Sequence, residues 1–260
     1  MSPQLLSSRL AGKVALVTGL GAGIGQGCAL MFARHGARVM SCDIDAGKAE
    51  AALQAAHAEG LSIESLHPCD LTKPDDVARL VAHTVARHGG LDILVNAAAW
   101  GAFKPIMEMD YERDWRATIT GELDLVFLAC KAAWPHFIAR GGGSIINFAS
   151  ANAHTTLAGS PALAHCAGKG GVLAMTRQLA AEGAPHRIRA NTISPALVVT
   201  DATRPSLELP GFVESVMAKS MLKMLGQPED VAWCATYLAS DESRWVTAAD
   251  FIIDGGAVHC

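Results

Sequence analysis

Short apolar runs alternate along the chain with longer segments whose apolar residues recur at helical spacing. Because strands covered on both faces of a parallel sheet are apolar throughout, the short runs predict buried strands. Expected strands lie at 13–18, 37–43, 62–68, 91–96, 144–150, 188–194 and 249–254, and expected helices at 23–35, 46–59, 74–88, 111–140, 161–184 and 227–240. The alternation predicts an α/β fold, namely one doubly wound domain with a mostly parallel seven-stranded sheet flanked by helices.

Two segments interrupt this regular pattern. The long helix at 111–140 contains Gly121 and Pro135, which we expect to be local weak points. Residues 196–225 are the least regular and carry three methionines, whose adaptable side chains suit an apolar substrate lid, although such spacing also fits ordinary packing. No change of composition marks a second domain, so the prediction is a single domain over 1–260 with a lid segment at about 196–225.

Composition and charge narrow the classes of protein to which the chain can belong. The chain has 260 residues, 50% of them hydrophobic, which is enough for one sizeable core. Its net charge of −4 gives no basic field that would favour nucleic acid or an anionic membrane. No apolar run approaches the roughly 18 residues that span a bilayer, and the first residues lack the features of a signal peptide. Seven scattered cysteines without a Cys-x-x-Cys pair indicate buried thiols in a reducing, cytoplasmic compartment rather than a metal site.

A glycine cluster stands between the first strand and the first helix. It comprises Gly19, Gly21, Gly23 and Gly25, with Ile24 among them. Glycines allow a sharp turn and a close approach of the backbone to a ligand, and the following helix directs free N–H groups toward that ligand. An acid about 20 residues further on, Asp43, completes the dinucleotide-binding fingerprint, whereas the alternative is an ordinary Gly-rich turn.

Asp43 at the end of the second strand bears on the choice of cofactor. Its carboxylate would accept hydrogen bonds from a ribose 2′-hydroxyl and repel a 2′-phosphate, which favours NAD over NADP. Asp43 could instead cap the next helix, although Asp45 could also do so. Arg38 and Lys48 lie nearby in sequence and keep NADP open.

Asp70 follows the third strand, at the carboxyl edge where ligands bind in open α/β sheets. It could meet the adenine amino group. Alternatively, Asp70 or Thr72 merely caps the helix that begins at Pro74.

Several motifs together resemble the short-chain dehydrogenase/reductase family over nearly the whole chain. Residues 18–25 resemble its Thr-Gly-x-x-x-Gly-x-Gly loop, and 96–99 resemble a degraded Asn-Asn-Ala-Gly. Residues 145–150 resemble the strand that ends in the family's active-site serine, here Ser150. Further similar stretches lie at 194–200, 226–232 and 254–256.

The resemblance implies a Rossmann-type domain and an oxidoreductase that transfers a hydride between nicotinamide and a small secondary alcohol or ketone. It implies NAD(H), with NADP(H) less favoured, and a homo-oligomer, dimer or tetramer, formed through the helices at 111–140 and 161–184. The residues it assigns to cofactor binding are Gly19, Gly21, Gly23, Ile24, Gly25, Asp43, Asp70, Leu71, Asn96, Lys169, Val198 and Thr200.

The catalytic pattern departs from the family at two positions. The family has Tyr-x-x-x-Lys, and here Lys169 is kept while His165 replaces the tyrosine. The family also has an asparagine about seven residues after a tryptophan, and counting from Trp115 gives Glu122. Ser150, His165, Lys169 and Glu122 are therefore the candidate catalytic residues.

His165 can replace the tyrosine chemically, since a neutral imidazole is a competent base near pH 7. His165 and Lys169 are one helical turn apart and share a face. A nearby ammonium disfavours the protonated imidazole, and a carboxylate such as Glu122 would favour it. Imidazole is shorter than phenol by roughly 2 Å, so a bridging water or a deeper substrate is needed for contact.

Other interpretations stay open. His165 could mark a lost function or be a satisfied buried polar residue, and Glu122 could be solvated or bonded to Lys169. The enzyme could keep the nucleotide for redox-neutral chemistry such as elimination or dehalogenation, or the chain could be an inactive binding relative. His154, His165 and Cys166 have no metal-ligand spacing. The substrate pocket is expected from 100–109, 151–160 and 196–225, and is mostly apolar because of Trp100, Phe103, Leu157 and Leu197.

Overall fold

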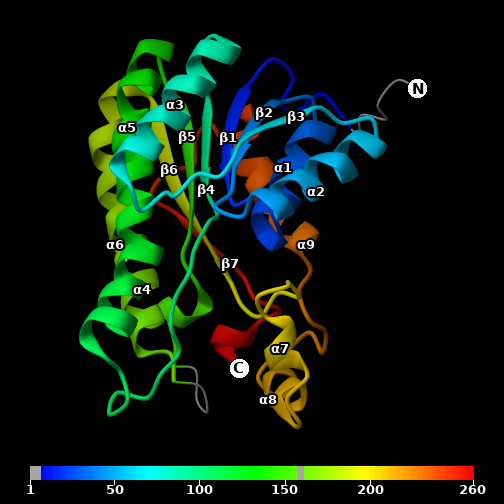
Figure 1. Cartoon of the computed structure of the whole chain (residues 1–260), viewed down its shortest axis with the longest axis vertical. Coiled ribbons are helices and arrows are strands. Elements are labelled where there is room, and N and C mark those ends of the chain that lie inside the picture. Colours follow the sequence, from blue (N-terminus) through cyan, green and yellow to red (C-terminus); the bar gives the residue numbers. More distant parts are fainter. Residues whose placement is uncertain (1–6, 157–160) are drawn as a thin grey trace.

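A seven-stranded parallel sheet forms the centre of the computed structural model, which describes residues 7–156 and 161–260 (Figure 1). The strand order is β3-β2-β1-β4-β5-β6-β7, and every neighbouring pair is parallel. The strands are β1 Val14–Thr18, β2 Arg38–Cys42, β3 Ile63–Leu66, β4 Ile93–Asn96, β5 Gly143–Phe148, β6 Ile188–Pro195 and β7 Asp250–Ile253. The predicted α/β fold with seven strands is confirmed.

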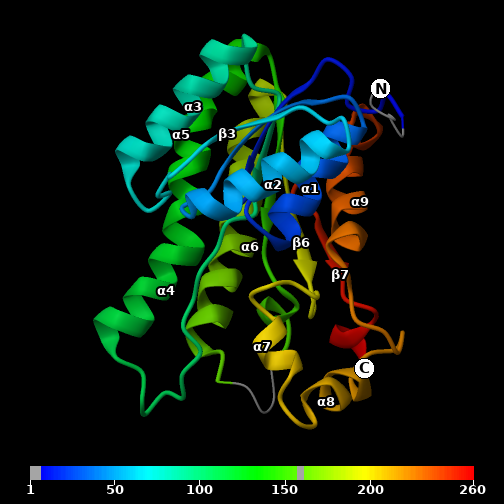
Figure 2. The ribbon, with the colours of Figure 1, turned by 45° about the vertical axis from the view of Figure 1, so that its right-hand side comes forward.

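Helices cover both faces of the sheet, so that it lies between two helical layers (Figures 1 and 2). The residues of β1 alternate between the two cores, with Ala15 and Val17 in one and Leu16 in the other. This explains why β1 is almost entirely apolar. One layer holds α1 Gly23–Arg34, α2 Ala46–Ala58 and α9 Pro228–Ala239, and the other holds α3 Pro74–His88, α5 Leu125–Arg140 and α6 Leu163–Gly183.

The long predicted helix at 111–140 is helical throughout but changes type. It has π-helical segments at Tyr111–Arg116 and Thr120–Asp124, the short α4 Ala117–Ile119 between them, and then α5. Gly121 lies in the second π segment, as a weak point was expected to. Pro135 does not interrupt α5, which continues through it to Arg140, and Ala133 and Phe137 pack in the core.

The predicted irregular segment at 196–225 contains two short helices, α7 Arg204–Leu207 and α8 Phe212–Ala218. Figure 1 shows α4, α7 and α8 at the same end of the molecule, and Figure 2 agrees. The prediction of uniformly buried thiols is wrong for Cys260, which is exposed, and only partly right for Cys166 and Cys234. No helix within the described ranges is long and apolar enough to cross a membrane.

The sheet has a topological switch point between β1 and β4, because the chain builds outward from β1 in one direction and from β4 in the other. Ligands of open α/β sheets bind at the carboxyl ends of the strands at such a point. Here Thr18 ends β1, and its Oγ1 accepts from the backbone N–H of Ala97 (2.9 Å) and of Ala98 (3.0 Å), which follow β4. The two strand ends are thus tied together beside the glycine turn.

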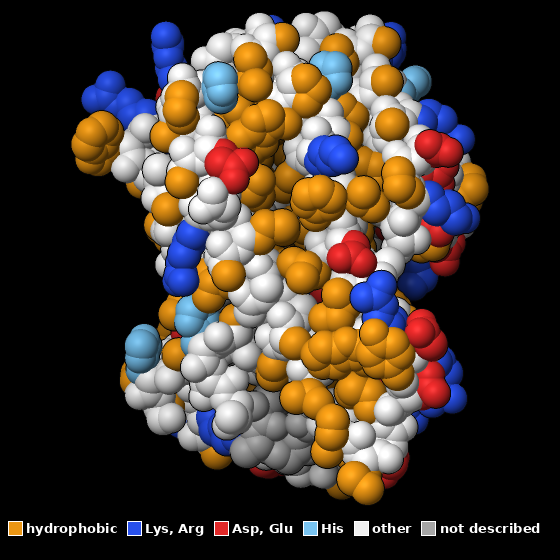
Figure 3. Space-filling view, turned by 90° about the vertical axis from the view of Figure 1, so that its left-hand side faces the viewer, with side chains coloured by type: hydrophobic (Ala, Val, Ile, Leu, Met, Phe, Trp, Pro, Cys, Tyr) orange, Lys and Arg blue, Asp and Glu red, His pale blue; other side chains and the backbone are white. Residues whose placement is uncertain are grey.

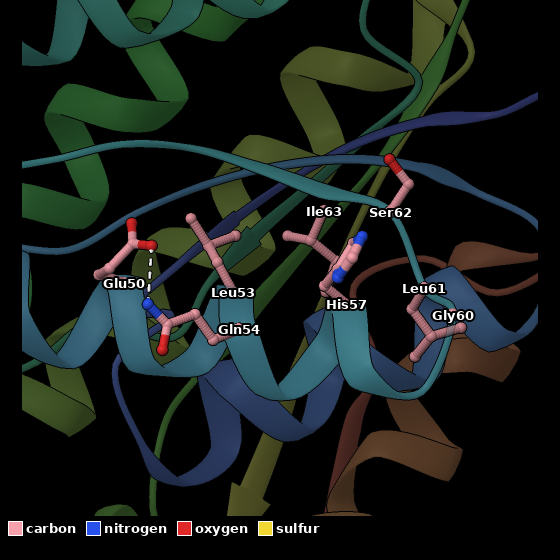
Figure 4. A pocket seen from close by; sticks show the side chains of 8 residues that line it. All are labelled: Glu50, Leu53, Gln54, His57, Gly60, Leu61, Ser62 and Ile63. Atoms are coloured by element: carbon pink, nitrogen blue, oxygen red, sulfur yellow. Dashed lines mark hydrogen bonds between the residues drawn. The ribbon is translucent and has the colours of Figure 1, made fainter.

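A hollow lies at the other end of the sheet, where α2 leads into β3 (Figure 4). Gln54 Nε2 donates to Glu50 Oε1 (3.2 Å) on its helical wall. Because this hollow is at the amino-terminal end of β3, it is separate from the switch point.

Candidate functional site

The glycine turn is shaped for a close approach between helix and strand. Gly19 and Gly23 have φ values of +82° and +66°, a region that favours glycine. At Gly25 a Cβ would lie 2.1 Å from the carbonyl oxygen of Gly19, so only glycine lets α1 start this close to β1. The sequence expectation of a functional tight turn therefore has a steric basis.

The amino-terminal end of α1 carries no groups that would compete with an anion. Ala22 is the N-cap and provides no side-chain hydrogen bond, and the first turn has no acidic residue. A helix N-terminus leaves backbone N–H groups free and has a partial positive charge. This end of α1, bordered by the glycines, fits the pyrophosphate of a nicotinamide dinucleotide.

Asp43 braces the glycine turn from the end of β2. Its Oδ2 accepts from the Gly21 N–H (2.7 Å) and its Oδ1 accepts from the Asp45 N–H (2.9 Å). Asp45, not Asp43, caps α2 by accepting from the Lys48 N–H (3.0 Å). The capping role is thus settled, and the Asp43 carboxylate stands beside the turn where a ribose would lie.

Arg38 and Lys48, the two basic residues that could contact the 2′-phosphate of NADP, lie at opposite ends of this region. Arg38 opens β2 at its amino-terminal end and reaches the Gly12 carbonyl (3.5 Å), whereas Asp43 follows the other end of that strand. Arg38 is therefore not available to a 2′-phosphate. Lys48 lies beside the turn, because a Cβ on Gly21 would come within 2.8 Å of its Cβ.

Asp70 lies in the loop after β3 and does not cap α3. The N-cap is Lys73, so the capping alternative for Asp70 or Thr72 is wrong. Asp70 Oδ1 accepts from the N–H (3.0 Å) and hydroxyl (2.7 Å) of Thr72, and the hydroxyl hydrogen bond lowers the pKa of Asp70. The carboxylate stays charged at this edge of the sheet, and Leu71 beside it is buried.

The remaining predicted cofactor residues serve the framework around the turn. Asn96 is 2% exposed, and its Nδ2 donates to Asn147 Oδ1 (2.8 Å), which ties β4 to β5. Val198 is buried and pairs with Gly226, while Thr200 exchanges hydrogen bonds with Thr203. A Cβ on Gly23 would lie 3.0 Å from Thr200 Cγ2, so the segment after β6 closes over the glycine turn.

Three of the four candidate catalytic residues form one connected set. The Nδ1 of His165 lies 2.6 Å from Glu122 Oε1, and the Nε2 lies 3.3 Å from Ser150 Oγ. Since a carboxylate accepts only, Nδ1 carries the proton that it donates to Glu122, which leaves Nε2 of the neutral ring to accept from the Ser150 hydroxyl. The site thus holds a base whose free nitrogen points at the serine.

Glu122 is held inside the protein by two glycines. The residue is 3% exposed, and its Oε2 has no hydrogen-bond partner among the described residues. A Cβ on Gly101 would lie 2.8 Å from its Oε1, and a Cβ on Gly168 would lie 2.7 Å from its Oε2. The π-helical segment that contains Glu122 frees the Gly121 carbonyl to accept from the Trp100 N–H (2.9 Å). The loop before this helix is thereby pinned over the carboxylate.

Lys169 is buried, as Glu122 is. Its Nζ donates to the Phe148 carbonyl (3.1 Å) at the end of β5, and not to Glu122, so the expected alternative of a Lys169–Glu122 bond is wrong. Burial lowers the pKa of Lys169, while the negative charge of Glu122 acts in the opposite direction. The ammonium and the carboxylate together make this buried end of the site close to neutral.

The wall of the site includes residues that the motifs did not reveal. The Phe103 ring lies 5.3 Å from the His165 ring, centroid to centroid, and is tilted by 36°. Gly101 and Gly168 make room for Glu122, and the only sequence signal for them was their small size. Of the apolar residues expected in the pocket, Trp100 and Phe103 are exposed, and Leu157 lies outside the described residues.

A second set of a serine, a histidine and an acid lies nearby but has a different hydrogen-bond pattern. His154 Nε2 donates to Asp250 Oδ2 (2.8 Å), and the same nitrogen lies 3.4 Å from Ser194 Oγ. Ser194 is fully buried and donates to Asp250 Oδ1 (2.8 Å). This set fastens the loop after Ser150 to β6 and β7.

Comparison with known proteins agrees with the geometry. A family model described as "Enoyl-(Acyl carrier protein) reductase" matches residues 19–258. The chain is 36% identical over 248 residues to D-threitol dehydrogenase from Mycolicibacterium smegmatis, which covers 95% of this chain and 94% of that protein.

Solved structures agree with this. A short-chain type dehydrogenase/reductase from Mycobacterium marinum superposes with a TM-score of 0.92 at 30% identity, over 96% of this chain and 97% of that one. A 7α-hydroxysteroid dehydrogenase, solved with NADH and 7-oxo glycochenodeoxycholic acid, superposes with a TM-score of 0.89 at 30% identity, over 95% of each chain. This family of enzymes uses a nicotinamide cofactor. With its parallel sheet, glycine turn and serine–lysine site, the chain belongs to the short-chain dehydrogenase/reductase family of oxidoreductases.

Proposed function

We propose that the protein is an NAD-dependent dehydrogenase/reductase that transfers a hydride between nicotinamide and a small secondary alcohol or ketone. The observation that carries this proposal is the orientation of His165, whose Nδ1 is held by Glu122 while Nε2 faces Ser150. An imidazole fixed in this way is a base with a defined proton-accepting atom, as alcohol oxidation requires. A histidine left over from a lost function would not need a buried carboxylate on its other nitrogen.

The preference for NAD rests on Asp43. Its carboxylate is fixed beside the glycine turn by the N–H groups of Gly21 and Asp45. A negative charge there would repel a 2′-phosphate and would accept hydrogen bonds from a free ribose hydroxyl. The related hydroxysteroid dehydrogenase structure, which contains NADH, is consistent with this choice.

The proposed chemistry divides between four side chains. The bound nicotinamide would accept or supply the hydride. In the oxidation direction, the Ser150 hydroxyl donates to the substrate oxygen and His165 Nε2 takes the alcohol proton. Glu122 then faces an imidazolium and stabilises its charge, so that it acts as a positioning residue that touches His165 and not the substrate. Lys169 supplies a buried positive charge next to this pair and supports the end of β5.

The surroundings favour an apolar substrate of modest size. Phe103 covers one side of His165. The segment after β6, which closes over the glycine turn at Thr200, also carries the exposed Met221, Leu222 and Met224. Adaptable methionine side chains can close over apolar groups of different shape. Because imidazole reaches less far than phenol, the carbinol carbon would sit deeper, near Ser150.

Titration of the purified protein with NADH and with NADPH tests the cofactor, read by nucleotide fluorescence. We expect the protein to bind NADH more tightly than NADPH. Asp43→Ala should weaken the binding of NADH and reduce the difference in affinity between the two nucleotides. Asp45→Asn is the matched control, because asparagine can still cap α2 and should leave nucleotide binding unchanged. Equal binding of both nucleotides by the unmodified protein would contradict the NAD preference.

A panel of apolar secondary alcohols and ketones tests the reaction by nicotinamide absorbance. We expect turnover that His165→Phe abolishes without loss of NADH binding. His165→Phe turnover equal to that of the unmodified protein would contradict the proposal. Tight NADH binding together with product formed at constant nicotinamide absorbance would favour redox-neutral chemistry instead.

We also propose that the protein is a homo-oligomer. Figure 3 shows the outer face formed by α5 and α6, where apolar side chains lie among charged ones. Phe127 and Ile138 on α5 and Leu163 on α6 are exposed. Light scattering should give a dimer or tetramer, and Phe127→Glu should shift the mass toward the monomer. A monomeric unmodified protein would contradict this.

A further inference from the structure

Ser150, His165 and Glu122 have the connectivity of an acyl-transfer triad. The serine oxygen and the carboxylate contact opposite nitrogens of one imidazole, at 3.3 Å and 2.6 Å. In such an arrangement the acid fixes the ring and favours its protonated form, while the free nitrogen removes the hydroxyl proton as the serine attacks. The histidine side chain is only 15% exposed and the glutamate 3%, so both contacts are shielded from water.

The same three residue types at His154 do not make a nucleophile. There the acid and the serine contact the same ring nitrogen, which donates to Asp250 and so cannot accept from Ser194. The Ser194 hydroxyl donates to Asp250, and Ser194 is fully buried. The difference between the two sets therefore lies in which atoms face one another and not in composition.

We propose that Ser150 is an activated nucleophile and that the protein has a second activity, the hydrolysis of small activated carboxylic esters through an acyl-Ser150 intermediate. This activity is independent of nicotinamide and goes beyond the hydride transfer proposed above. It uses an oxygen that would otherwise only hold the substrate.

The proposed steps conserve atoms and involve no change of oxidation state. His165 Nε2 takes the Ser150 proton as Oγ bonds to the ester carbonyl carbon. The bond from that carbon to the leaving oxygen breaks, and the leaving group receives the proton from Nε2. Water then attacks the acyl-serine with His165 as base, which releases the carboxylic acid and restores the Ser150 hydroxyl.

Backbone geometry limits the class of substrate. The Asn152 N–H donates to Ser150 Oγ (3.2 Å), so a backbone donor lies beside the atom that attacks. Stabilisation of the developing oxyanion usually takes two or more aligned donors. We therefore expect reaction with aryl esters, whose leaving groups need little help, and not with amides.

The test uses the full-length protein without nucleotide and p-nitrophenyl acetate as the probe. We expect a burst of nitrophenolate and one added acetyl group on Ser150, located by peptide mass spectrometry. Ser150→Ala should abolish this label, and His165→Gln should slow its formation about a hundredfold or more. NADH titration of each variant shows whether it is folded.

Ser194→Ala and Cys166→Ala are the matched controls. Ser194→Ala removes the serine of the other set, and Cys166 adjoins His165 but has a pKa raised by burial, so neither should change the rate. An acetyl group found on Cys166 or on lysines instead, with an unchanged burst in Ser150→Ala, would overturn the proposal.

Glu122→Gln separates positioning from folding. If the carboxylate fixes the ring, its loss should slow the burst, while each folded molecule still releases one nitrophenolate. A purely structural role would lower the number of molecules that react without changing the rate constant of the burst, and this result would contradict the role of Glu122 in the triad.

Discussion

Two neighbouring sets of a serine, a histidine and an acid differ in what their geometry permits. In one, Ser150 and Glu122 contact opposite nitrogens of His165. In the other, Ser194 and Asp250 contact the same nitrogen of His154, and Thr192 also donates to Asp250. The first leaves a nitrogen free to accept a proton from Ser150. The second commits its serine proton to the acid and is suited to holding β6, β7 and the loop after β5 together.

The difference between the two hydrogen-bond patterns follows from where Asp250 and Glu122 lie in the fold. Asp250 begins β7 and meets hydroxyls from β6, so hydrogen bonds to neutral groups satisfy it. Glu122 lies in a π-helical segment between two glycines and has one oxygen without a partner in the described part of the chain. A buried carboxylate left partly unsatisfied is costly, so the hydrogen bond from the His165 ring is the contact that stabilises Glu122.

The largest expected effect separates the two histidines. His165→Gln should lower kcat for hydride transfer by about 10²–10⁴-fold, because it removes the proton acceptor. His154→Gln should keep kcat within about threefold and cost about 1 kcal/mol of unfolding free energy, since one hydrogen bond to Asp250 is weakened. Steady-state kinetics and urea unfolding measure both. Equal losses of kcat in the two variants would remove the distinction.

Glu122→Gln tests the acid of the first set. We expect kcat to fall by about 10- to 100-fold, because glutamine cannot stabilise the imidazolium. Asp250→Asn should leave kcat unchanged, because Asp250 is bonded to His154, Thr192 and Ser194 instead. Nicotinamide turnover of each folded variant measures both effects, and an unchanged kcat in Glu122→Gln would place Glu122 among the structural residues.

Gly168 and Gly170 form a matched pair on α6. A Cβ at 168 would lie 2.7 Å from Glu122 Oε2, whereas a Cβ at 170 would meet nothing within 4 Å. Gly168→Ala should therefore displace Glu122, lower kcat and cost about 1–3 kcal/mol of unfolding free energy. Gly170→Ala should stabilise the helix by about 0.5–1 kcal/mol with kcat unchanged. If Gly168→Ala and Gly170→Ala shift the unfolding midpoint in the same direction by similar amounts, Glu122 has room to move away from the added methyl group.

The smallest effect concerns the pH dependence of stability. Burial lowers the pKa of Lys169 below its ordinary value of 10.5, so between the folded-state pKa and 10.5 the unfolded chain binds more protons and stability rises with pH. Lys169→Met lacks this dependence. The advantage of Lys169→Met over the unmodified protein should shrink as pH rises toward 10.5, measured by urea unfolding across alkaline pH. A constant difference would show that the pKa of Lys169 is not shifted.

Local pattern was sufficient for most of the fold. The apolar runs placed all seven strands, and α3 begins and ends at the predicted residues. Pro135 does not end α5, and Ala133 and Phe137, two residues away on either side, are buried. The prediction of buried thiols failed at Cys260, which is exposed. The prediction that Asp70 or Thr72 caps α3 was also wrong. These two residues form a hydrogen bond with each other, and Lys73 is the N-cap.

The family's motifs located the candidate site in the sequence but did not show which atoms meet. Ser150, His165 and Lys169 were placed by their resemblance to those motifs. The sequence left open whether Asp43 or Asp45 caps α2, and the structure shows that Asp45 does. The partner of Glu122 could not be predicted, since Lys169 and His165 were both within the range that spacing allows. The roles of Gly101 and Gly168 depend on a loop and a helix that are far apart in sequence.

By itself, the sequence determined the parallel sheet and the glycine turn, because strand burial, turn geometry and helical periodicity are local properties. Its resemblance to the family's motifs identified the four candidate catalytic residues, which are Ser150, Glu122, His165 and Lys169. Only the tertiary structure decided that Glu122 faces His165, that Lys169 bonds to Phe148, and that His154 is committed to Asp250. Which atom of a side chain meets which partner depends on the packing of segments distant in the chain. Because of that packing, the set around His165 is a candidate for catalysis, whereas the set around His154 holds β6, β7 and the loop after β5 together.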